Sequence, residues 1–407
     1  MKLAIHGGAP VRTKPFPAWP IWGEAEERAL LRVLESGKWG SIDGGEVREF
    51  EREFAEYHQA KFAIACTNGT AALEITLRAA GVQAGDEVLV PAYTFVATAT
   101  AVLNNGAIPV FVDIDPETYN IDPAKVEEAI TGKTFGVIPV HFAGRPADMD
   151  RIMEIAQKRG LAVIEDAAQG PGASWRGNPV GALGTAGTFS FQSSKNINAG
   201  EGGLILTNDE NVARLAKSFV NCGRDEGGVW YAHYRLGGNY RMTEFQGAVL
   251  RTQLSRYREQ FTMREASARI LDKGLKQSPG VWTLSQDSRI TGHAQHLYIF
   301  RYDSAEFDGL NKEKFVTALN AEGIPCSAGY PIPLYKQPLF QKQAFASFSR
   351  SLQSKANYKD VFLPETENAC YKEAIWLPQN VLLDSPDGVK SILEAVSKIH
   401  THRRELN

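Results

Sequence analysis

The chain has 407 residues, of which 43% are hydrophobic and 22% are charged, and its formal net charge is −3. This composition is typical of a globular protein with about two or three domains. The near-neutral charge gives no electrostatic reason to expect nucleic acid as a partner.

Targeting and redox signals are sparse. No apolar run has the length of a signal-peptide core or a membrane span, so we expect no membrane association. The cysteines lie far apart without a CxxC pair, which argues against a zinc site or a disulfide framework and favours a cytoplasmic location. They are Cys66, Cys222, Cys326 and Cys370.

The first half of the chain predicts an α/β domain. An amphipathic helix over 24–36 stops at Gly37, and later helices cover 70–80 and the segment after Asp148. Short apolar runs between and beside the helices predict strands, at 62–66, 87–90, 109–114, 135–140, 161–165 and 203–207. Because these runs are continuously apolar, they favour a mainly parallel sheet covered by helices on both faces.

The second half has a different pattern of predicted helices and strands. A long helix begins at Thr243-x-x-Gln246, which resembles a capping box. Beyond about residue 280, a strand over 297–302 and helices over 311–322 and 386–399 predict an α+β region. We therefore expect a large α/β domain over 1–260 and a smaller C-terminal α+β domain over 261–407.

Lys195 is the first candidate for chemistry. It is the only charged residue between Gly177 and Gly200, in a stretch of small and apolar residues. Desolvation lowers the pKa of an amine and makes it a usable nucleophile or Schiff-base former. The alternative is a loop lysine whose flexible stem reaches water.

Asp166 ends the apolar run before Ala167-Ala168-Gln169, about thirty residues before Lys195. Ligands of open α/β sheets bind beyond the carboxyl ends of strands. A carboxylate there, followed by an isolated lysine, is the pair that pyridoxal 5′-phosphate needs, since the carboxylate keeps the pyridine nitrogen protonated. The alternative is a helix N-cap or an ordinary ion pair.

Two further segments fit the same ligand. Thr67-Asn68-Gly69-Thr70 turns from a strand straight into a helix, and helix N-termini bind phosphate. Phe95 follows another strand, where it could stack on a flat ring. The alternative for Thr67–Thr70 is ordinary helix capping, and the alternative for Phe95 is packing in a core.

In this combination the chain resembles the fold-type-I pyridoxal phosphate enzymes, and more narrowly the DegT/DnrJ/StrS family of sugar and cyclitol aminotransferases. The resemblance covers nearly the whole chain. The segments that carry it are Gly37-Lys-Trp39, Thr67-Asn-Gly-Thr70, Pro91-Ala-Tyr-Thr-Phe95, Pro139-Val-His141, Ile164-Glu-Asp-Ala-Ala168, Phe189-Ser-Phe191 through Lys195, Gly200-Glu-Gly-Gly203 and Gly238-Asn-Tyr-Arg-Met242. It implies a mainly parallel seven-stranded sheet between helices, and a homodimer with shared active sites.

The resemblance also implies roles for individual residues. Lys195 would hold the cofactor as a Schiff base, and Asp166 would pair with its ring nitrogen. The other cofactor contacts that it implies are Gln169 beside the ring, Phe95 stacked on it, and Gly69, Thr70 and Ser190 at the phosphate. The Gly-Asn-Tyr-Arg segment would reach the phosphate of the neighbouring subunit through Asn239, with Arg241 as the rival.

Substrate contacts are less closely matched. His141 is expected to line the substrate cavity, with a satisfied core histidine as the alternative. Many relatives carry Pro-Leu-His-x-Gln, whereas this chain has Pro333-Leu-Tyr335-Lys-Gln337, so Tyr335 replaces the substrate-side histidine. This departure leans toward keto-cyclitols rather than nucleotide-linked sugars. His293-x-x-His296 lacks an acidic third ligand, so no metal site is expected.

The expected activity is transfer of an amino group from L-glutamate or L-glutamine to a ketone on a sugar or cyclitol. One alternative is a dehydratase or ring-forming synthase of the same family, although the related dehydratases replace the lysine with histidine. Another is a non-catalytic regulator that binds the same cofactor.

Overall fold

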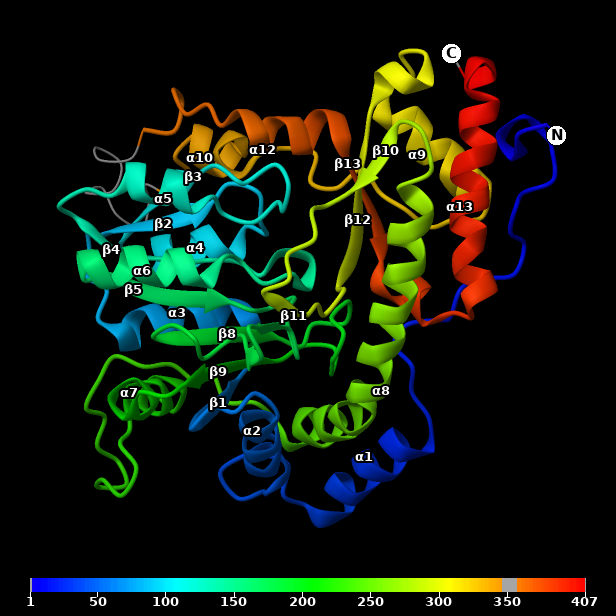
Figure 1. The fold of residues 1–407 in the computed structure, drawn as a ribbon. Coiled ribbons are helices and arrows are strands. Elements are labelled where there is room, and N and C mark those ends of the chain that lie inside the picture. The colour runs from blue at the N-terminus through cyan, green and yellow to red at the C-terminus, as the bar shows by residue number, and fades with distance from the viewer. Residues whose placement is uncertain (1, 346–356, 407) are drawn as a thin grey trace.

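The computed structural model describes residues 2–345 and 357–406. A seven-stranded sheet forms its centre, in the order β1-β9-β8-β5-β4-β2-β3 (Figure 1). All of its strands run parallel except β9, which pairs antiparallel with both β1 and β8. The strands are β1 (Phe62–Cys66), β2 (Glu87–Pro91), β3 (Ile108–Val112), β4 (Thr134–Val137), β5 (Ala162–Asp166), β8 (Ala186–Ser190) and β9 (Gly203–Thr207). The predicted mainly parallel sheet is confirmed.

Helices cover both faces of this sheet, because its strands are apolar on both sides. In β2, Val88 and Val90 pack with α3 (Gly69–Ala80) and α4 (Ala97–Asn104), while Leu89 packs with α5 (Pro123–Ala129) and α6 (Met149–Arg159). This alternation follows from the two-residue period of a strand. α7 (Glu210–Val220) lies on the α3 face.

Helix α8 (Glu244–Leu275) connects the two halves of the molecule. It begins with the predicted capping box between Thr243 and Gln246. Its first turns contact α1 (Glu24–Ser36) and α2 (Glu46–Tyr57), whereas Leu271 and Leu275 pack into the C-terminal core. The predicted boundary between residues 260 and 261 lies inside this continuous helix, and the division into two domains stays a prediction.

The C-terminal half is built on a three-stranded antiparallel sheet of β10 (Val281–Thr283), β12 (Leu297–Tyr302) and β13 (Ala374–Pro378). α9 (Lys312–Ala321), α13 (Pro386–Thr401) and the end of α8 pack against it. A second small sheet joins β11 (Ile290–Gly292) to β6 (Ser174–Trp175) and β7 (Asn178–Pro179). The short helices α10 (Pro338–Gln341) and α12 (Pro364–Asn368) also belong to this half.

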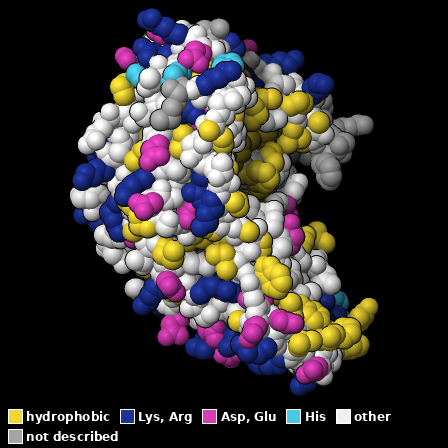
Figure 2. Space-filling view, turned by 90° about the vertical axis from the view of Figure 1, so that its right-hand side faces the viewer, with side chains coloured by type: hydrophobic (Ala, Val, Ile, Leu, Met, Phe, Trp, Pro, Cys, Tyr) yellow, Lys and Arg dark blue, Asp and Glu magenta, His cyan; other side chains and the backbone are white. Residues whose placement is uncertain are grey.

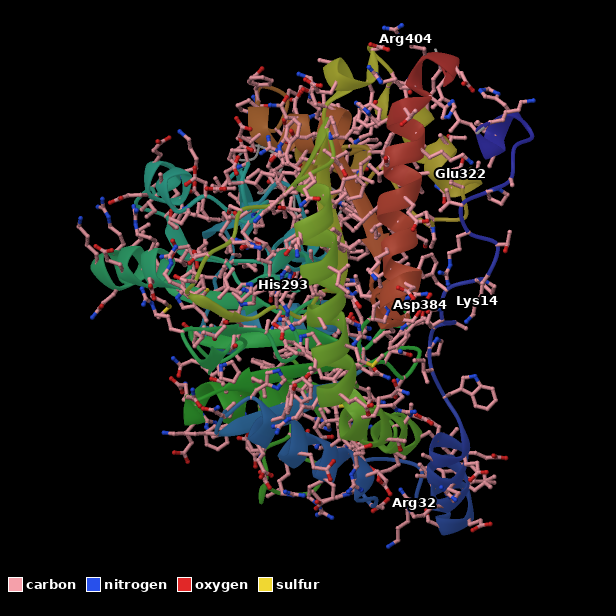
Figure 3. All side chains as sticks on the ribbon, turned by 45° about the vertical axis from the view of Figure 1, so that its right-hand side comes forward. Lys14, Arg32, His293, Glu322, Asp384 and Arg404 are labelled. Carbon is pink, nitrogen blue, oxygen red and sulfur yellow. The ribbon has the colours of Figure 1, made fainter. Side chains whose placement is uncertain are left out.

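The N-terminal segment runs beside the C-terminal half (Figure 3). Glu322 accepts hydrogen bonds from the backbone of Ala4 and Val11, both at 2.9 Å, and Arg12 pairs with Asp384. Within residues 2–345 and 357–406, no helix combines the length and apolarity that crossing a membrane requires.

Candidate active site

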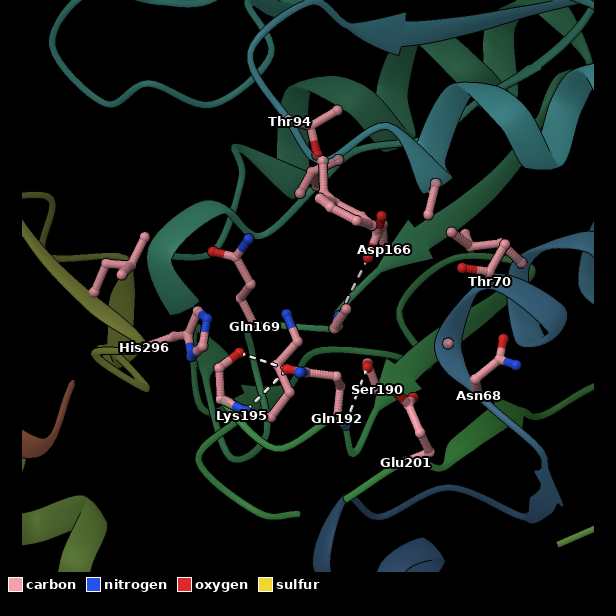
Figure 4. Close-up of a pocket in the computed structure, with 18 of the residues that line it drawn as sticks. Asn68, Thr70, Thr94, Asp166, Gln169, Ser190, Gln192, Lys195, Glu201 and His296 are labelled. Atoms are coloured by element: carbon pink, nitrogen blue, oxygen red, sulfur yellow. Dashed lines mark hydrogen bonds between the residues drawn. The ribbon is translucent and has the colours of Figure 1, made fainter. Parts of the chain in front are cut away.

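A cavity of about 980 Å³ lies between the two halves of the molecule (Figure 4). On one side it is lined by the carboxyl ends of β5 and β8, the first residues of α3 and the segment after β2. On the other side it is lined by the start of β12 and the end of β13. Ligands of parallel sheets bind at this edge, because loops and helix N-termini converge there.

Lys195 lies in the loop after β8 and is half-buried in the cavity wall. Its amine has no hydrogen-bond partner among the residues that the structure describes. Burial lowers the pKa of Lys195 to about 8, although the negative charge of Asp166 partly opposes this shift. An amine with this pKa is partly neutral at physiological pH, and its neutral form is a competent nucleophile and proton acceptor.

Asp166 is the last residue of β5 and is buried. Its Oδ2 accepts a hydrogen bond from Thr98 Oγ1 at 2.8 Å, and its Oδ1 accepts one from the backbone N–H of Ala168 at 3.2 Å. Burial raises the pKa of Asp166, while these hydrogen bonds and the charge of Lys195 act in the opposite direction. Each carboxylate oxygen keeps a second lone pair with which it could accept a proton-bearing ring nitrogen.

The start of α3 forms a cradle for an anion. Asn68 caps the helix by accepting the Ala71 N–H at 2.8 Å, and the other first-turn N–H groups point out of the helix end beside Gly69 and Thr70. A Cβ atom on Gly69 would lie 2.8 Å from the Cβ of Ser190, so only glycine allows this close approach of helix and strand.

Gln169 and Phe95 line the same cavity. Gln169 Oε1 accepts the Ala143 N–H at 2.7 Å, which fixes the orientation of its amide. The Phe95 ring is 58% exposed, so one of its faces is available for stacking. The amine of Lys195, the carboxylate of Asp166, the helix N-terminus and this aromatic ring together fit pyridoxal 5′-phosphate.

His141 lies outside the lining of this cavity. It is fully buried, its Nδ1 accepts the Ala147 N–H at 3.1 Å, and its Nε2 therefore donates to Glu165 Oε2 at 3.0 Å. Glu165 also accepts backbone N–H groups of Gly181, Leu183 and Gly184 at 2.7–2.8 Å. This is the geometry of a satisfied core histidine, so the expected substrate role has no support from its position.

Tyr335 also lies away from the cavity, contrary to the expectation for a substrate-side residue. It is fully buried against Phe111 in the core on the α4 face of the sheet. Its hydroxyl donates to Glu367 at 2.7 Å and accepts the Leu363 N–H at 3.2 Å. Its ring packs in this core, so the expected substrate role of Tyr335 has no support from its position.

Asn239 and Arg241 do not line the cavity of their own chain either. Asn239 is exposed and forms an isolated bridge with Asn221, and Arg241 donates to the Asn221 side chain at 2.8 Å. An exposed Asn239 is available to a second subunit, so the predicted contact with a neighbouring chain stays a prediction.

Seven lining residues come from the second half, and the sequence predicts none of them as a site residue: His296, Leu297, Tyr330, Trp376, Pro378, Gln379 and Asn380. His296 was considered only as a weak metal ligand. In the sequence, His296 stands just before a predicted strand. That position does not reveal that the start of the strand faces the large sheet.

Comparisons with known proteins place the chain in a family. Residues 20–397 match the model of the DegT/DnrJ/EryC1/StrS aminotransferase family. A protein of Streptoalloteichus tenebrarius, described as an L-glutamine:3-amino-2,3-dideoxy-scyllo-inosose aminotransferase, is 39% identical over 406 residues, or 98% of this chain and 97% of that protein.

Solved structures show the same fold. A 3-amino-5-hydroxybenzoic acid synthase matches with a TM-score of 0.86 at 35% identity, covering 97% of this chain and 100% of that chain. NtdA from Bacillus subtilis, solved with the cofactor PMP bound, matches with a TM-score of 0.81 at 28% identity, covering 97% of this chain and 86% of that chain.

Proposed function

The chain belongs to the DegT/DnrJ/EryC1/StrS family of pyridoxal phosphate-dependent aminotransferases, and on this premise we propose that it moves an amino group from L-glutamine or L-glutamate to a ketone on a cyclitol or sugar. The observation that carries the proposal is the presence of Lys195, with its lowered pKa, and buried Asp166 in one cavity beside the α3 N-terminus.

Each residue of the site would have its own role in the proposed reaction. Pyridoxal 5′-phosphate, when bound, would supply an electron sink for the substrate carbon. Lys195 Nζ would hold the cofactor and, once displaced by the donor amine, would move the proton from the donor's α-carbon. Asp166 would hold a proton on the ring nitrogen, and the α3 N–H groups with Ser190 would bind the phosphate.

The lining of the cavity favours an uncharged, hydroxylated acceptor. Apart from Lys195, no lysine or arginine of the described residues lines it, whereas Glu74, Asp166 and Glu201 do. A nucleotide diphosphate would bring two or more negative charges against these carboxylates, which is unfavourable. A keto-cyclitol avoids this cost and agrees with the name of the relative from Streptoalloteichus.

A second copy of the chain is the partner that we propose. Segment 229–236 exposes Val229, Trp230, Tyr231, Tyr234 and Leu236, each between 52% and 87%. Figure 2 shows hydrophobic side chains gathered at the lower right of the molecule. Covering such a patch favours association, and it would bring the neighbouring Asn239 near a partner. Sedimentation tests this proposal. We expect the wild type to be a dimer and Leu236→Asp to be a monomer, and a monomeric wild type would contradict the proposed dimer.

We also propose a cytoplasmic location. The four cysteines are unpaired, and free thiols persist in a reducing compartment. Cell fractionation tests this expectation.

The visible spectrum of the cofactor-loaded protein tests the function. We expect L-glutamine or L-glutamate to bleach the cofactor band, and a keto-cyclitol to restore it and appear as an amine. Loss of water from the substrate without net amino transfer would favour the dehydratase or synthase. A band unaffected by any amino acid would favour the regulator.

A further inference from the structure

The imidazole of His296 presents a hydrogen-bond acceptor to the cavity. Its Nδ1 lies 3.0 Å from Asn196 Oδ1, and Asn196 Nδ2 donates to the Ala294 carbonyl at 2.7 Å. Because this contact fixes the Asn196 amide, its oxygen faces His296 and Nδ1 must carry the proton. The other nitrogen, Nε2, then has a free lone pair, and it has no partner among the described residues. Figure 4 shows the ring beside Lys195.

Gln379 presents a donor to the same cavity. Its Oε1 accepts Nε and Nη2 of Arg264 at 2.8 and 2.5 Å. Arginine can only donate, so this contact fixes the amide and turns its NH₂ group away from Arg264. No described residue accepts from that NH₂ group, although Gln379 is only 3% exposed and lines the cavity.

The two groups adjoin the last pair of a strand ladder. Leu297 of β12 is paired with Pro378 of β13 in an antiparallel register. His296 precedes Leu297 and Gln379 follows Pro378, so the same register continued by one residue sets His296 opposite Gln379, a spacing at which side chains can share one ligand. Burial lowers the pKa of His296, and the charges of Lys195 and Arg264 lower it further, so its lone pair stays available near neutral pH.

We propose that His296 and Gln379 form one binding site for a hydroxyl group next to the ketone of the acceptor. The hydroxyl proton would be donated to His296 Nε2, and the hydroxyl oxygen would accept an N–H of Gln379. A hydroxyl suits this pair because it donates and accepts at one atom. A ketone without the hydroxyl would leave both protein groups unpaired, and this difference gives specificity. The inference rests on the proposed aminotransfer and adds a selection for α-hydroxyketones.

If His296 had only a structural role, its substitution would affect the two half-reactions differently from the loss of a hydroxyl site. Asn196 adjoins Lys195, so loss of the His296 contact could displace the lysine. Such a displacement would slow both half-reactions alike, because both use Lys195. A hydroxyl site would slow mainly the acceptor half-reaction, and only for ketones that carry the hydroxyl.

The test uses the cofactor-loaded protein and its variants His296→Phe and Gln379→Leu. The control is His293→Phe, which makes the same substitution three residues earlier; His293 is hydrogen-bonded to Gln295 and lines a different cavity (Figure 3). Stopped-flow absorbance gives the donor half-reaction with L-glutamine or L-glutamate. It also gives kcat/KM of the acceptor half-reaction with 2-hydroxycyclohexanone and with cyclohexanone.

We expect the wild type and His293→Phe to prefer 2-hydroxycyclohexanone by about tenfold or more, the effect of one well-placed hydrogen-bonded group. His296→Phe and Gln379→Leu should each bring this ratio close to one, and should slow the acceptor half-reaction with the hydroxyketone far more than the donor half-reaction. An unchanged ratio in both variants, equal loss in both half-reactions, or no preference in the wild type would overturn the hydroxyl site. Absence of any half-reaction in the wild type would instead refute the proposed function.

Discussion

Thr98 on α4 donates a 2.8 Å hydrogen bond to the carboxylate of Asp166 at the end of β5. The contact joins a helix on one face of the sheet to the group that we assign to the cofactor nitrogen. The hydroxyl oxygen of Thr94 lies 3.2 Å from that of Thr98, so Asp166 is held by a short chain of two hydroxyl groups. Its orientation is therefore set before any ligand binds.

Substitutions of Asp166 and of Thr98 should both lower kcat, but by different amounts. Asp166→Asn removes the charge that would keep the ring nitrogen protonated, and we expect kcat to fall by about 100-fold or more. Thr98→Val preserves shape and removes one hydrogen bond to a buried carboxylate, so about a tenfold loss is expected. Steady-state kinetics measure both. The control is Thr100→Val, because the Thr100 hydroxyl donates to the Ala97 carbonyl and to no other group of the described residues. A loss there equal to that of Thr98→Val would contradict the assignment.

The pH at which Lys195 reacts provides a second prediction. Only the neutral amine is nucleophilic, and burial lowers the pKa of Lys195 to about 8. The rate at which cofactor-free protein captures added pyridoxal phosphate should therefore rise with pH and reach half its maximum near pH 8, instead of near the ordinary value of 10.5. Asp166→Asn should move the midpoint to lower pH, because the carboxylate raises this pKa. Lys195→Ala should capture no cofactor, and Lys158→Ala, an exposed lysine, should behave as wild type.

The contact between Gly69 and Ser190 predicts a rescue. Gly69→Ala would place its Cβ 2.8 Å from that of Ser190, and overpacking of this kind costs about 1–3 kcal/mol. We expect a lower melting temperature and weaker cofactor binding. Adding Ser190→Gly removes the opposing Cβ, so it should restore part of the stability but not the phosphate contact of the serine. Calorimetry and a cofactor titration check this; a double variant no more stable than Gly69→Ala would refute the clash.

Glu51 on α2 makes stability depend on pH. Burial raises its pKa from 4.5 to about 7, despite the 2.7 Å hydrogen bond from the Ala65 N–H. Between these pH values the folded protein holds a proton that the unfolded chain releases, so the free energy of unfolding should fall as pH rises from 4.5 to 7.

Glu51→Gln removes this titration and keeps an amide oxygen for Ala65. At pH 8 it should be more stable than the wild type by about 1–3 kcal/mol, and at pH 4.5 about equal to it. Urea unfolding at both pH values is the measurement. The exposed Glu154→Gln should show no such gain, and equal stability of Glu51→Gln and wild type at pH 8 would contradict the prediction.

Much of the fold could be predicted because its signals are local. The six apolar runs, the cap of α8 and the helix starting at Pro386 depend on residues next to one another. Strand β8 was not among the predicted strands, because Ala186-Gly187-Thr188 lacks apolar bulk. Its Gly187 is required by packing: a Cβ there would lie 2.4 Å from the Cα of Gly181.

The site was only partly predictable for a related reason. Asp166 ends one strand of the large sheet, and Lys195 and Gly69 follow two others, so the sequence order itself indicates that they meet. His296 and Gln379 reach the cavity from another sheet, through a strand pairing that no local pattern reveals. Tyr335 is a different case: its motif predicts a substrate-side residue, but a motif does not reveal whether a side chain faces a core or a cavity, and this one is buried.

Adjacent carboxylates at the end of β5 have opposite surroundings. Glu165 is enclosed by backbone N–H groups and His141, and Asp166 faces the cavity. Since successive residues of a strand point to opposite faces, a slip of β5 by one position against β8 would exchange the two. The longer side chain would then enter the ligand site, and the shorter one would be left among donors spaced for a glutamate. The hydrogen bonds around Glu165 therefore favour the one register of β5 that places Asp166 on the cavity side.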